Sequence, residues 1–259
     1  MNDGPLAGCR VLVTRPDGQA DELCQAIAEA GGEAIRFPVI RVTARDRRLV
    51  RQELNALPVP DMAIFISSNA VEYGLDLIDA GETTIVAVGP ATAAAIAAHG
   101  IDVDVCPGRG FDSEHLLAHA ALQDVAGTSI LIVRGETGRP LLGDTLRERG
   151  ARVDYLAVYC RATNRLPDEV VQSLAQAWRD GRVDCVTVMS GETFESLLAL
   201  LPADCVDYLR ETPLVAPSDR VLKTARKLVP GIPAILASGP RTGDLLDALI
   251  LWRQSGQHS

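Results

Sequence analysis

The chain is poor in aromatic residues and almost devoid of lysine. Aromatic side chains make up only 4% of the 259 residues, although 47% of the residues are hydrophobic. The core must therefore be aliphatic, which suits parallel sheets whose strands are buried on both faces. Lys223 and Lys227 are the only lysines, and they stand four positions apart on one predicted helix. This placement disfavours a Schiff-base lysine and the lysine of a phosphate-binding loop.

Motifs that would identify a cofactor or a metal are missing as well. The six cysteines form no C-x-x-C pair, and several lie inside apolar runs, so they are interpreted as buried thiols in a reducing compartment. No G-x-G-x-x-G is present, so a nicotinamide cofactor has no support. His115 and His119 have a spacing that could bind zinc, but no third ligand completes the pattern. We expect a surface helix there, no metal and no cofactor.

Charge and hydropathy limit the partners and the location. The net charge of −9 argues against binding to nucleic acid or to an anionic membrane. No apolar run approaches the length of a membrane span, and the first residues lack the charged and apolar regions of a signal peptide. We therefore expect a cytoplasmic protein that binds neither nucleic acid nor a membrane.

One strand-to-helix pattern occurs twice in the sequence. Residues 63–72 run from an apolar strand into a hydroxyl-rich helix start, and residues 185–195 repeat this with Ser190 at the position of Ser67. A second pair, residues 86–92 and 214–219, places Ser218 at the position of Thr92. Such a long-period echo indicates two similar domains. Among the alternating elements, the residue pattern predicts a helix at residues 69–79, a short strand at 103–106 and a helix at 168–179. Because predicted strands and helices alternate along the chain, we predict a doubly wound α/β fold with right-handed crossovers.

The predicted elements also indicate where the domains begin and end. The first strand, helix and strand, within residues 10–37, are too few to form a domain alone, and they can complete the C-terminal block. We therefore predict a discontinuous domain 1 of residues 1–37 and 164–259 and a domain 2 of residues 44–156. Residues 38–43 and 157–163 are predicted to be two connector strands that lie side by side.

Hydroxyl groups and arginines gather where the predicted strands end. In α/β sheets, ligands bind at these ends and at the helix N-termini that follow. N-capping explains any single hydroxyl, but their occurrence at equivalent places in both halves favours an anion site. For the two arginines of the turn at residues 133–139, carboxylate binding and loop solubility both remain open. The predicted binding residues are Thr14, Arg15, Ser67, Ser68, Asn69, Thr92, Arg134, Gly135, Arg139, Ser190, Gly191 and Ser218.

Tyr159 is the candidate catalytic residue. It is one of only four tyrosines and lies in the second predicted connector. A phenol there could deliver a proton into a cleft between domains, and aromatic packing between the connectors is the alternative.

The strand-end motifs occur in a distinctive order and spacing. They are Val11-Leu12-Val13-Thr14-Arg15-Pro16, Ile64-Phe65-Ile66-Ser67-Ser68-Asn69-Ala70-Val71-Glu72, Val88-Gly89-Pro90-Ala91-Thr92, Leu131-Ile132-Val133-Arg134-Gly135-Glu136 with Gly138-Arg139, Val158-Tyr159, and Pro217-Ser218-Asp219-Arg220. Together they resemble the uroporphyrinogen-III synthase family over about residues 10 to 250. Ile66 replaces the threonine often seen before the first serine, while Ser67 and Ser68 remain nearby.

The resemblance implies a fold and a reaction. It implies two flavodoxin-like doubly wound parallel-sheet domains joined by a two-stranded β connector, with the site between them. It implies a cofactor-free lyase that cyclises linear hydroxymethylbilane to uroporphyrinogen III, with inversion of ring D and loss of water, in the biosynthesis of tetrapyrroles such as heme, siroheme and cobalamin. Tyr159 resembles the family's candidate proton donor. Because the substrate carries eight carboxylates and the protein is acidic, local arginines and helix N-termini must bind it.

The resemblance also bears on partners, and one rival function remains open. We expect a monomer that receives hydroxymethylbilane, in a transient hand-over from hydroxymethylbilane synthase. The rival is a non-enzymatic two-lobed protein that binds an anionic small molecule at the same helix termini. Supplying hydroxymethylbilane separates the two, because only the enzyme directs the product to isomer III instead of the spontaneous isomer I.

Overall fold

The chain forms two structural units, and the first of them is made from both ends of the sequence. The computed structural model describes residues 4–108 and 112–256. Unit 1 comprises Met1–Arg41 and Ala162–Ser259, and unit 2 comprises Val42–Arg161. The chain thus passes from one unit to the other within the two segments that the sequence indicated as connectors. Residues 1–3 and 257–259, which the predicted domain 1 includes, lie outside the described residues.

Unit 1 is built on a five-stranded sheet. Its strands are β1 (Arg10–Val13), β2 (Glu33–Arg36), β8 (Cys185–Thr187), β9 (Leu214–Ala216) and β10 (Ala234–Leu236). They lie in the order β10-β9-β8-β1-β2, and the paired strands run parallel. Counted within the unit, this is the order 2-1-3-4-5 of flavodoxin-like sheets. The apolar runs of β1, β8 and β9 form strands at the buried centre of the sheet, where both faces are covered, whereas the edge strands β2 and β10 are partly exposed.

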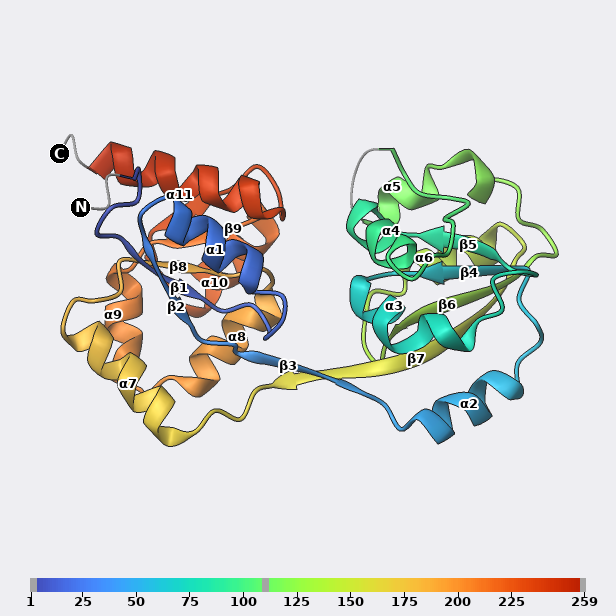
Figure 1. Cartoon of the computed structure of the whole chain (residues 1–259), viewed down its shortest axis with the longest axis horizontal. Coiled ribbons are helices and arrows are strands. Elements are labelled where there is room, and N and C mark those ends of the chain that lie inside the picture. Colours follow the sequence, from blue (N-terminus) through green and yellow to red (C-terminus); the bar gives the residue numbers. More distant parts are fainter. Residues whose placement is uncertain (1–3, 109–111, 257–259) are drawn as a thin grey trace. The chain divides into compact units, whose positions relative to one another are not determined.

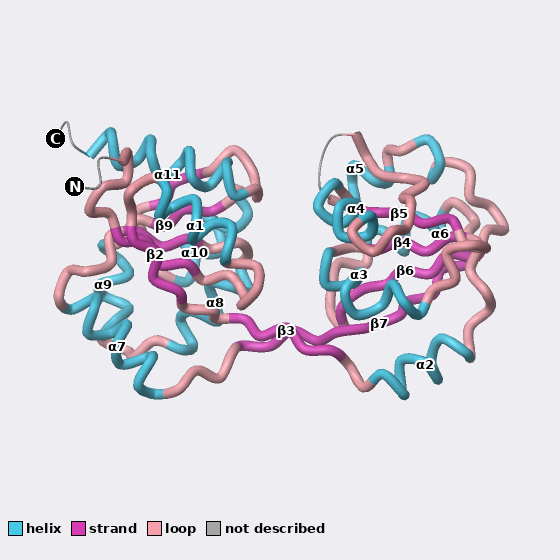
Figure 2. The backbone as a smooth tube through the Cα atoms, in the orientation of Figure 1, coloured by secondary structure: helices cyan, strands magenta, loops and turns pink. Residues whose placement is uncertain are grey.

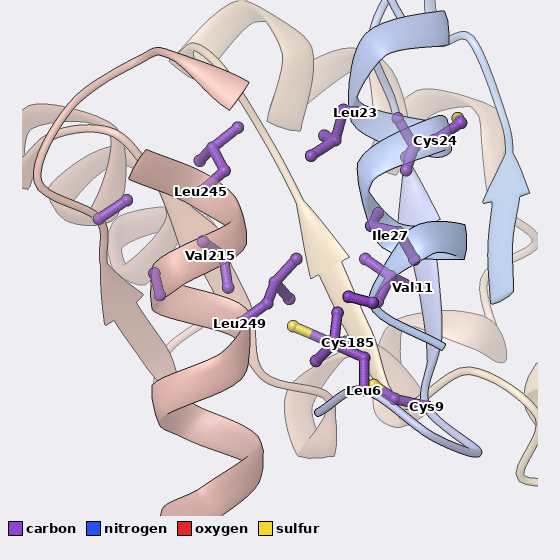
Figure 3. Close-up of a cluster of buried hydrophobic side chains, with 14 of the residues drawn as sticks. Leu6, Cys9, Val11, Leu23, Cys24, Ile27, Cys185, Val215, Leu245 and Leu249 are labelled. Atoms are coloured by element: carbon purple, nitrogen blue, oxygen red, sulfur yellow. The ribbon is translucent and has the colours of Figure 1, made fainter. Parts of the chain in front are cut away.

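Six helices accompany this sheet. They are α1 (Asp21–Glu29), α7 (Asp168–Arg179), α8 (Gly191–Leu200), α9 (Cys205–Glu211), α10 (Asp219–Leu228) and α11 (Thr242–Gly256). Helices α1 and α11 pack on the same face of the sheet, where Ile27 and Leu249 meet Val11 and Cys185 (Figure 3). Burying one such aliphatic side chain stabilises the fold by about 1.5–3 kcal/mol. Helix α7 packs against α9, and α8 packs against α10.

Unit 2 has the same sheet order, except that one edge strand is antiparallel. Its strands are β3 (Ile40–Ala44), β4 (Met62–Phe65), β5 (Thr84–Ala87), β6 (Ser129–Gly135) and β7 (Arg152–Thr163), in the order β3-β7-β6-β4-β5 (Figure 1). Strands β5, β4, β6 and β7 reproduce the order 2-1-3-4, and β3 takes the place of a fifth parallel strand. The N–H of Asn164 donates to the carbonyl of Val39, and the N–H of Arg45 donates to that of Val158. As the residue number rises along β3, the number of its hydrogen-bonded partner on β7 falls, so the two strands run antiparallel.

The helices of unit 2 are mostly shorter than those of unit 1 (Figure 2), and two 3₁₀ turns accompany them. They are α2 (Arg47–Asn55), α3 (Ser68–Gly74), α4 (Pro90–Ala97), α5 (Ser113–Leu117) and α6 (Leu141–Glu148), with the 3₁₀ turns η1 (Leu75–Leu77) and η2 (Ala120–Leu122). Along β4 the side chains alternate between the two faces of the sheet. Met62 and Ile64 pack with residues of α5 and α6, whereas Ala63 and Phe65 pack with residues of α3.

The predicted α/β fold is confirmed, with local differences. The strand predicted at residues 103–106 is a single bridge between Val86 and Val105. The helix predicted at residues 69–79 ends at Gly74, and helix α9 was not predicted. Strand β7 runs to Thr163, because the predicted connector 157–163 continues the last strand of unit 2. In the described part of the chain, no helix has the length and apolar character needed to cross a membrane.

Candidate functional site

Each sheet has one place where the strand order changes direction. In unit 1 it lies between β1 and β8, and in unit 2 it lies between β4 and β6. The loops that follow such strands diverge to opposite faces and leave room for a ligand at the C-terminal edge. Arg15 follows β1, Ser190 follows β8, Ser67 follows β4, and Arg134 lies near the end of β6. Both edges therefore carry residues that the sequence indicated.

The two serines of the repeated motif have the same local geometry. Ser67 adopts an extended backbone, and its Oγ accepts the N–H of Ala70, 3.1 Å away, at the start of α3. Ser190 does the same for the N–H of Thr193, also at 3.1 Å, at the start of α8. The repeat therefore encodes N-caps, each of which stabilises its helix by about 1 kcal/mol. Capping uses one acceptor position of the hydroxyl and leaves its proton available.

Tyr159 lies at the C-terminal edge of the sheet of unit 2, against Ser67. The Tyr159 hydroxyl is 3.1 Å from the Oγ of Ser67, and the tyrosine is only 5% exposed. Its ring centroid lies 6.2 Å from that of Tyr73 on α3. Burial raises the pKa of Tyr73, with Glu72 adding to the shift. The structure thus joins two residues, 92 positions apart, that the sequence indicated separately.

Gly135 has a steric reason to be glycine. A Cβ atom added there would lie 2.7 Å from Cε2 and 2.9 Å from Cζ of Tyr159. The missing side chain therefore provides the surface on which the Tyr159 ring rests. The sequence indicated Gly135 as a place where backbone could approach a ligand, and in the structure the group that approaches it is the Tyr159 ring.

Arg15 is, with Arg253, one of two described arginines of unit 1 whose Nε is buried without a hydrogen-bond partner, and it is the one that follows β1. Its Nη2 donates to the carbonyl of Pro240 at 3.1 Å, while its Nε is buried without a hydrogen-bond partner in the described structure. Burial lowers the pKa of this guanidinium, and Glu22 offsets the shift only in part. No ion pair holds Arg15 among residues 4–108 and 112–256. An anion at this edge would satisfy a donor that is otherwise costly to bury.

The two arginines of the predicted turn, Arg134 and Arg139, differ in whether a carboxylate of the protein already pairs with them. Arg139 is bound by both carboxylate oxygens of Glu114 on α5, at 2.5 and 3.0 Å. Arg134 lies over the ring of Tyr155, 5.0 Å from its centroid, and no described carboxylate pairs with it. A Cβ added to Gly138 would lie 2.2 Å from Nη2 of Arg134, so this glycine makes room for the guanidinium. Arg134 is therefore better placed than Arg139 to bind a substrate carboxylate.

The remaining predicted binding residues lie at the expected strand ends with varied exposure. Thr14 is fully buried, and its hydroxyl donates to the carbonyl of Thr187 at 2.6 Å, which uses its proton. The Oγ of Ser68 reaches the carbonyl of Ala91 only at 3.4 Å. Asn69 and Thr92 are buried. Gly191 opens α8 and packs against Thr224, and Ser218 precedes α10 without a side-chain capping bond.

Other candidate features are accounted for by local structure. The Nδ1 of His115 pairs with Asp112, and the Nδ1 of His119 accepts the N–H of Ala121. No three His, Cys, Asp or Glu side chains in the described residues are grouped as metal ligands. A cavity of about 290 Å³ lies beside α2, η1 and the start of β5. Its described lining contains no cation, and it is at the opposite edge of the sheet from Ser67.

Sequence reasoning missed three residues that shape the unit 2 edge. Tyr73 and Tyr155 support Tyr159 and Arg134, and Arg45 binds the main chain of β7 beside Tyr159. The tyrosines could have been noticed because the chain has only four. Nothing in the sequence marks Arg45 among so many arginines.

A family model, relatives in sequence and solved structures were compared with the chain, and all three comparisons find the same family. The family model described as "Uroporphyrinogen-III synthase HemD" matches residues 21–247. Uroporphyrinogen-III synthase of Proteus mirabilis is 32% identical over 73% of this chain and 97% of its own length, and that of Escherichia coli is 30% identical over 84% and 91%.

Two solved structures share the fold. A variant of the Thermus thermophilus uroporphyrinogen III synthase superposes with a TM-score of 0.62 at 19% identity, covering 97% of this chain and all of that one. The Helicobacter pylori uroporphyrinogen-III synthetase gives 0.63 at 14% identity, covering 95% and 99%. Because the family model spans most of the sequence and relatives of 30% identity or more are matched over nearly their whole length, the chain belongs to the uroporphyrinogen-III synthase family.

Proposed function

We propose that this chain cyclises hydroxymethylbilane to uroporphyrinogen III, with inversion of ring D and loss of water. The observation that carries the chemical part of this proposal is the hydroxyl pair of Tyr159 and Ser67, 3.1 Å apart at the C-terminal edge of unit 2. Departure of the substrate hydroxyl as water requires a proton on the leaving oxygen. A phenol or serine hydroxyl at a strand end is suited to supply it.

The hydrogen bonding of the pair leaves one proton for a ligand in either arrangement. Ser67 Oγ already accepts the N–H of Ala70, so the bond to Tyr159 uses either its proton or its second lone pair. When Ser67 donates to Tyr159, the phenol proton points to the ligand. When Tyr159 donates to Ser67, the serine proton does. Tyr159 and Ser67 therefore act as one proton-donating unit, and the loss of either should be felt at the leaving oxygen.

Substrate binding is assigned to cations and helix N-termini on both units. Arg15 in unit 1 and Arg134 in unit 2 lack carboxylate partners among the described residues. The start of α8, with Ser190 and Gly191, and the start of α10, with Ser218, offer main-chain N–H groups to carboxylates. Several donors share the charge, so Ser190 or Ser218 alone should contribute only about 0.5–1.5 kcal/mol to substrate binding. Catalysis then depends largely on holding the linear chain in its reactive conformation.

The test compares Tyr159→Phe with Tyr73→Phe. Both variants remove one phenol oxygen from the same cluster, but only the first removes the partner of Ser67. We expect Tyr159→Phe to lower turnover about 10²-fold or more, the scale of general-acid assistance, and Tyr73→Phe to change it little. The measurement is the initial rate of isomer III formation from hydroxymethylbilane, with isomer I as the spontaneous background.

The possible outcomes separate the two parts of the proposal. If wild-type protein yields only isomer I, the proposed reaction is wrong. If Tyr159→Phe keeps wild-type turnover while isomer III still forms, the reaction stands and the proton donor is another group. Thermal melts of both variants show whether a lost rate reflects lost folding.

We further propose that the protein is a cytoplasmic monomer that receives its substrate by transient hand-over from hydroxymethylbilane synthase. Its six cysteines, which form no C-x-x-C pair and lie in part inside apolar runs, motivate a reducing compartment. Sedimentation at micromolar concentration tests the monomer, and a coupled assay with an inert trap for free hydroxymethylbilane tests the hand-over. A trap that abolishes isomer III would contradict direct transfer.

A further inference from the structure

Strand β7 contains one extra residue where it passes the end of β6. Arg134 pairs with Ala157, but the next residue, Gly135, pairs with Tyr159, so Val158 has no partner on β6. Such a bulge breaks the alternation of side chains between the two faces. Val153 and Tyr155 lie on the α6 side of the sheet, whereas Val158 and Tyr159 both lie on the α3 side. Strict alternation would have turned Tyr159 away from Ser67.

Arg45, immediately after β3, binds the main chain of this bulge. Its N–H donates to the carbonyl of Val158 at 3.0 Å, and its Nη1 donates to the carbonyl of Ala157 at 2.8 Å. These are the two carbonyls that precede Tyr159 in the chain. One half-buried arginine therefore binds both sides of the irregular step, with its main chain on Val158 and its side chain on Ala157, and a substitution at position 45 removes only the side-chain bond.

Two carboxylates orient the same guanidinium. Glu53 on α2 accepts from Nη1 and Nη2 at 2.8 and 2.9 Å, and Glu136, after β6, lies 3.2 Å from Nε. The N–H of Glu136 in turn donates to the carbonyl of Tyr159 at 3.0 Å. Arg45 is thus connected to Tyr159 from both strands that flank the bulge. Only a planar guanidinium can reach three such partners at once, because a lysine ammonium lacks the fork of donors.

We propose that Arg45 is a positioning residue for Tyr159: by holding the Ala157 carbonyl of the β7 bulge with its guanidinium, it keeps the Tyr159 hydroxyl beside Ser67. The proposal rests on the proposed role of Tyr159 in proton donation for its kinetic consequence, but not for its structural one. Arg45 itself does not enter the chemistry. Its removal should lower turnover and leave substrate affinity nearly unchanged, because the groups assigned to carboxylate binding are elsewhere.

The kinetic test is a double-mutant cycle of Arg45→Lys and Tyr159→Phe. In the wild-type background we expect Arg45→Lys to lower kcat about 10- to 100-fold, as expected when a catalytic group is displaced by about 1 Å, with KM changed less than about two-fold. In the Tyr159→Phe background the same substitution should change kcat less than about two-fold, because coupled residues are not additive. An equal fall in both backgrounds would show that Arg45 does not act through Tyr159.

Arg149→Lys is the matched control. Arg149 is also half-buried in unit 2 and donates to two main-chain carbonyls, those of Leu117 and Leu122, at 2.9 and 2.8 Å. It lies away from the bulge, so its substitution should reproduce the general loss of stability without the change in kcat. Should Arg45→Lys fail to fold, Glu136→Gln weakens the same anchor more gently, and we expect a smaller fall in kcat of the same kind.

A structural readout keeps the inference testable whatever the kinetics show. The chain has four tyrosines, so 3-fluorotyrosine labelling gives four ¹⁹F resonances, and the Tyr159→Phe variant assigns one of them. We expect Arg45→Lys to shift or broaden the Tyr159 resonance while the Tyr208 resonance in unit 1 stays in place, and Arg149→Lys to leave both unchanged. An unmoved Tyr159 resonance in Arg45→Lys overturns the proposal. A moved resonance with full activity in both Arg45→Lys and Tyr159→Phe supports the positioning and overturns the catalytic role of Tyr159.

Discussion

Gly135→Ala is a one-carbon perturbation of the Tyr159 hydroxyl. The added Cβ would lie 2.7 Å from Cε2 and 2.9 Å from Cζ of Tyr159, whereas unstrained carbon contacts need about 3.5–4.0 Å. The ring must therefore recede by about 1 Å, which would lengthen its 3.1 Å contact with Ser67 to about 4 Å, beyond hydrogen-bond range. A shift of this size can lower turnover about 10²-fold. The overpacking should also cost about 1–3 kcal/mol of unfolding free energy.

The assay for Gly135→Ala combines turnover with stability. Initial rates of isomer III formation give the first quantity, and urea unfolding gives the second. Gly32→Ala is the control, because its Cβ would meet Ile27 at 3.0 Å in unit 1, away from Tyr159. We expect both variants to lose stability and only Gly135→Ala to lose turnover. A Gly135→Ala protein that turns over within two-fold of wild type, or a Gly32→Ala protein that loses as much, would refute this reasoning.

Four further outcomes are expected. Arg15→Gln should raise KM about 10- to 100-fold, because a charge-assisted hydrogen bond contributes about 1.5–3 kcal/mol. Arg139→Gln should raise KM less, because Glu114 already pairs with Arg139. Equal increases in KM for the two variants in steady-state kinetics would contradict this expectation. Hydrogen bonding to Arg241 lowers the pKa of Asp244, so this carboxylate stabilises the fold at neutral pH, and the stabilisation is lost as the pH falls through the lowered pKa. The difference in melting temperature between wild type and Asp244→Asn should therefore narrow on acidification. A difference that stays constant with pH would contradict this expectation. Burial raises the pKa of Cys9 to about 11, with Asp184 adding to the shift, so iodoacetamide at pH 8 should leave Cys9 unlabelled by mass spectrometry until the protein unfolds. Exhaustive chelation should leave isomer III formation intact, and activity that is lost and then restored by a metal ion would disprove this expectation.

Local pattern was sufficient for much of the fold. The helix predicted at residues 168–179 is α7, because acidic residues fill its first turn and Leu174 and Trp178 recur on one face. Helix α9 escaped prediction because only Cys205 and Leu209 of its seven residues are buried, which is too short a run to show a period. The apolar residues around Val105 predict a strand, but only the single bridge to Val86 forms.

The candidate site was less predictable because its determinants are non-local. Strand ends and helix starts located Ser67 and Ser190, but the fate of each hydroxyl depends on which group lies across from it. Thr14 turns its hydroxyl to a carbonyl that is 173 positions away in the chain. Arg139 and Glu114 are 25 positions apart and meet only after α5 and α6 have packed. The bulge that turns Tyr159 toward α3 arises from the pairing of β6 with β7, and no periodicity in β7 alone reveals it.

The way the chain crosses between the units has a consequence for the order of folding. Unit 2 is a continuous stretch of 120 residues, from 42 to 161, inserted into the sequence of unit 1. Joining β1, which ends at Val13, to β8, which starts at Cys185, in an otherwise unfolded chain would close a loop of about 170 residues, at a chain-entropy cost of about 4.5 kcal/mol. Once unit 2 has folded, β3 and β7 lie side by side at its sheet edge, and residues 39 and 164 are already hydrogen-bonded neighbours. The inserted unit then serves as a template that brings the two halves of the interrupted unit together, so that its assembly becomes a nearly local event.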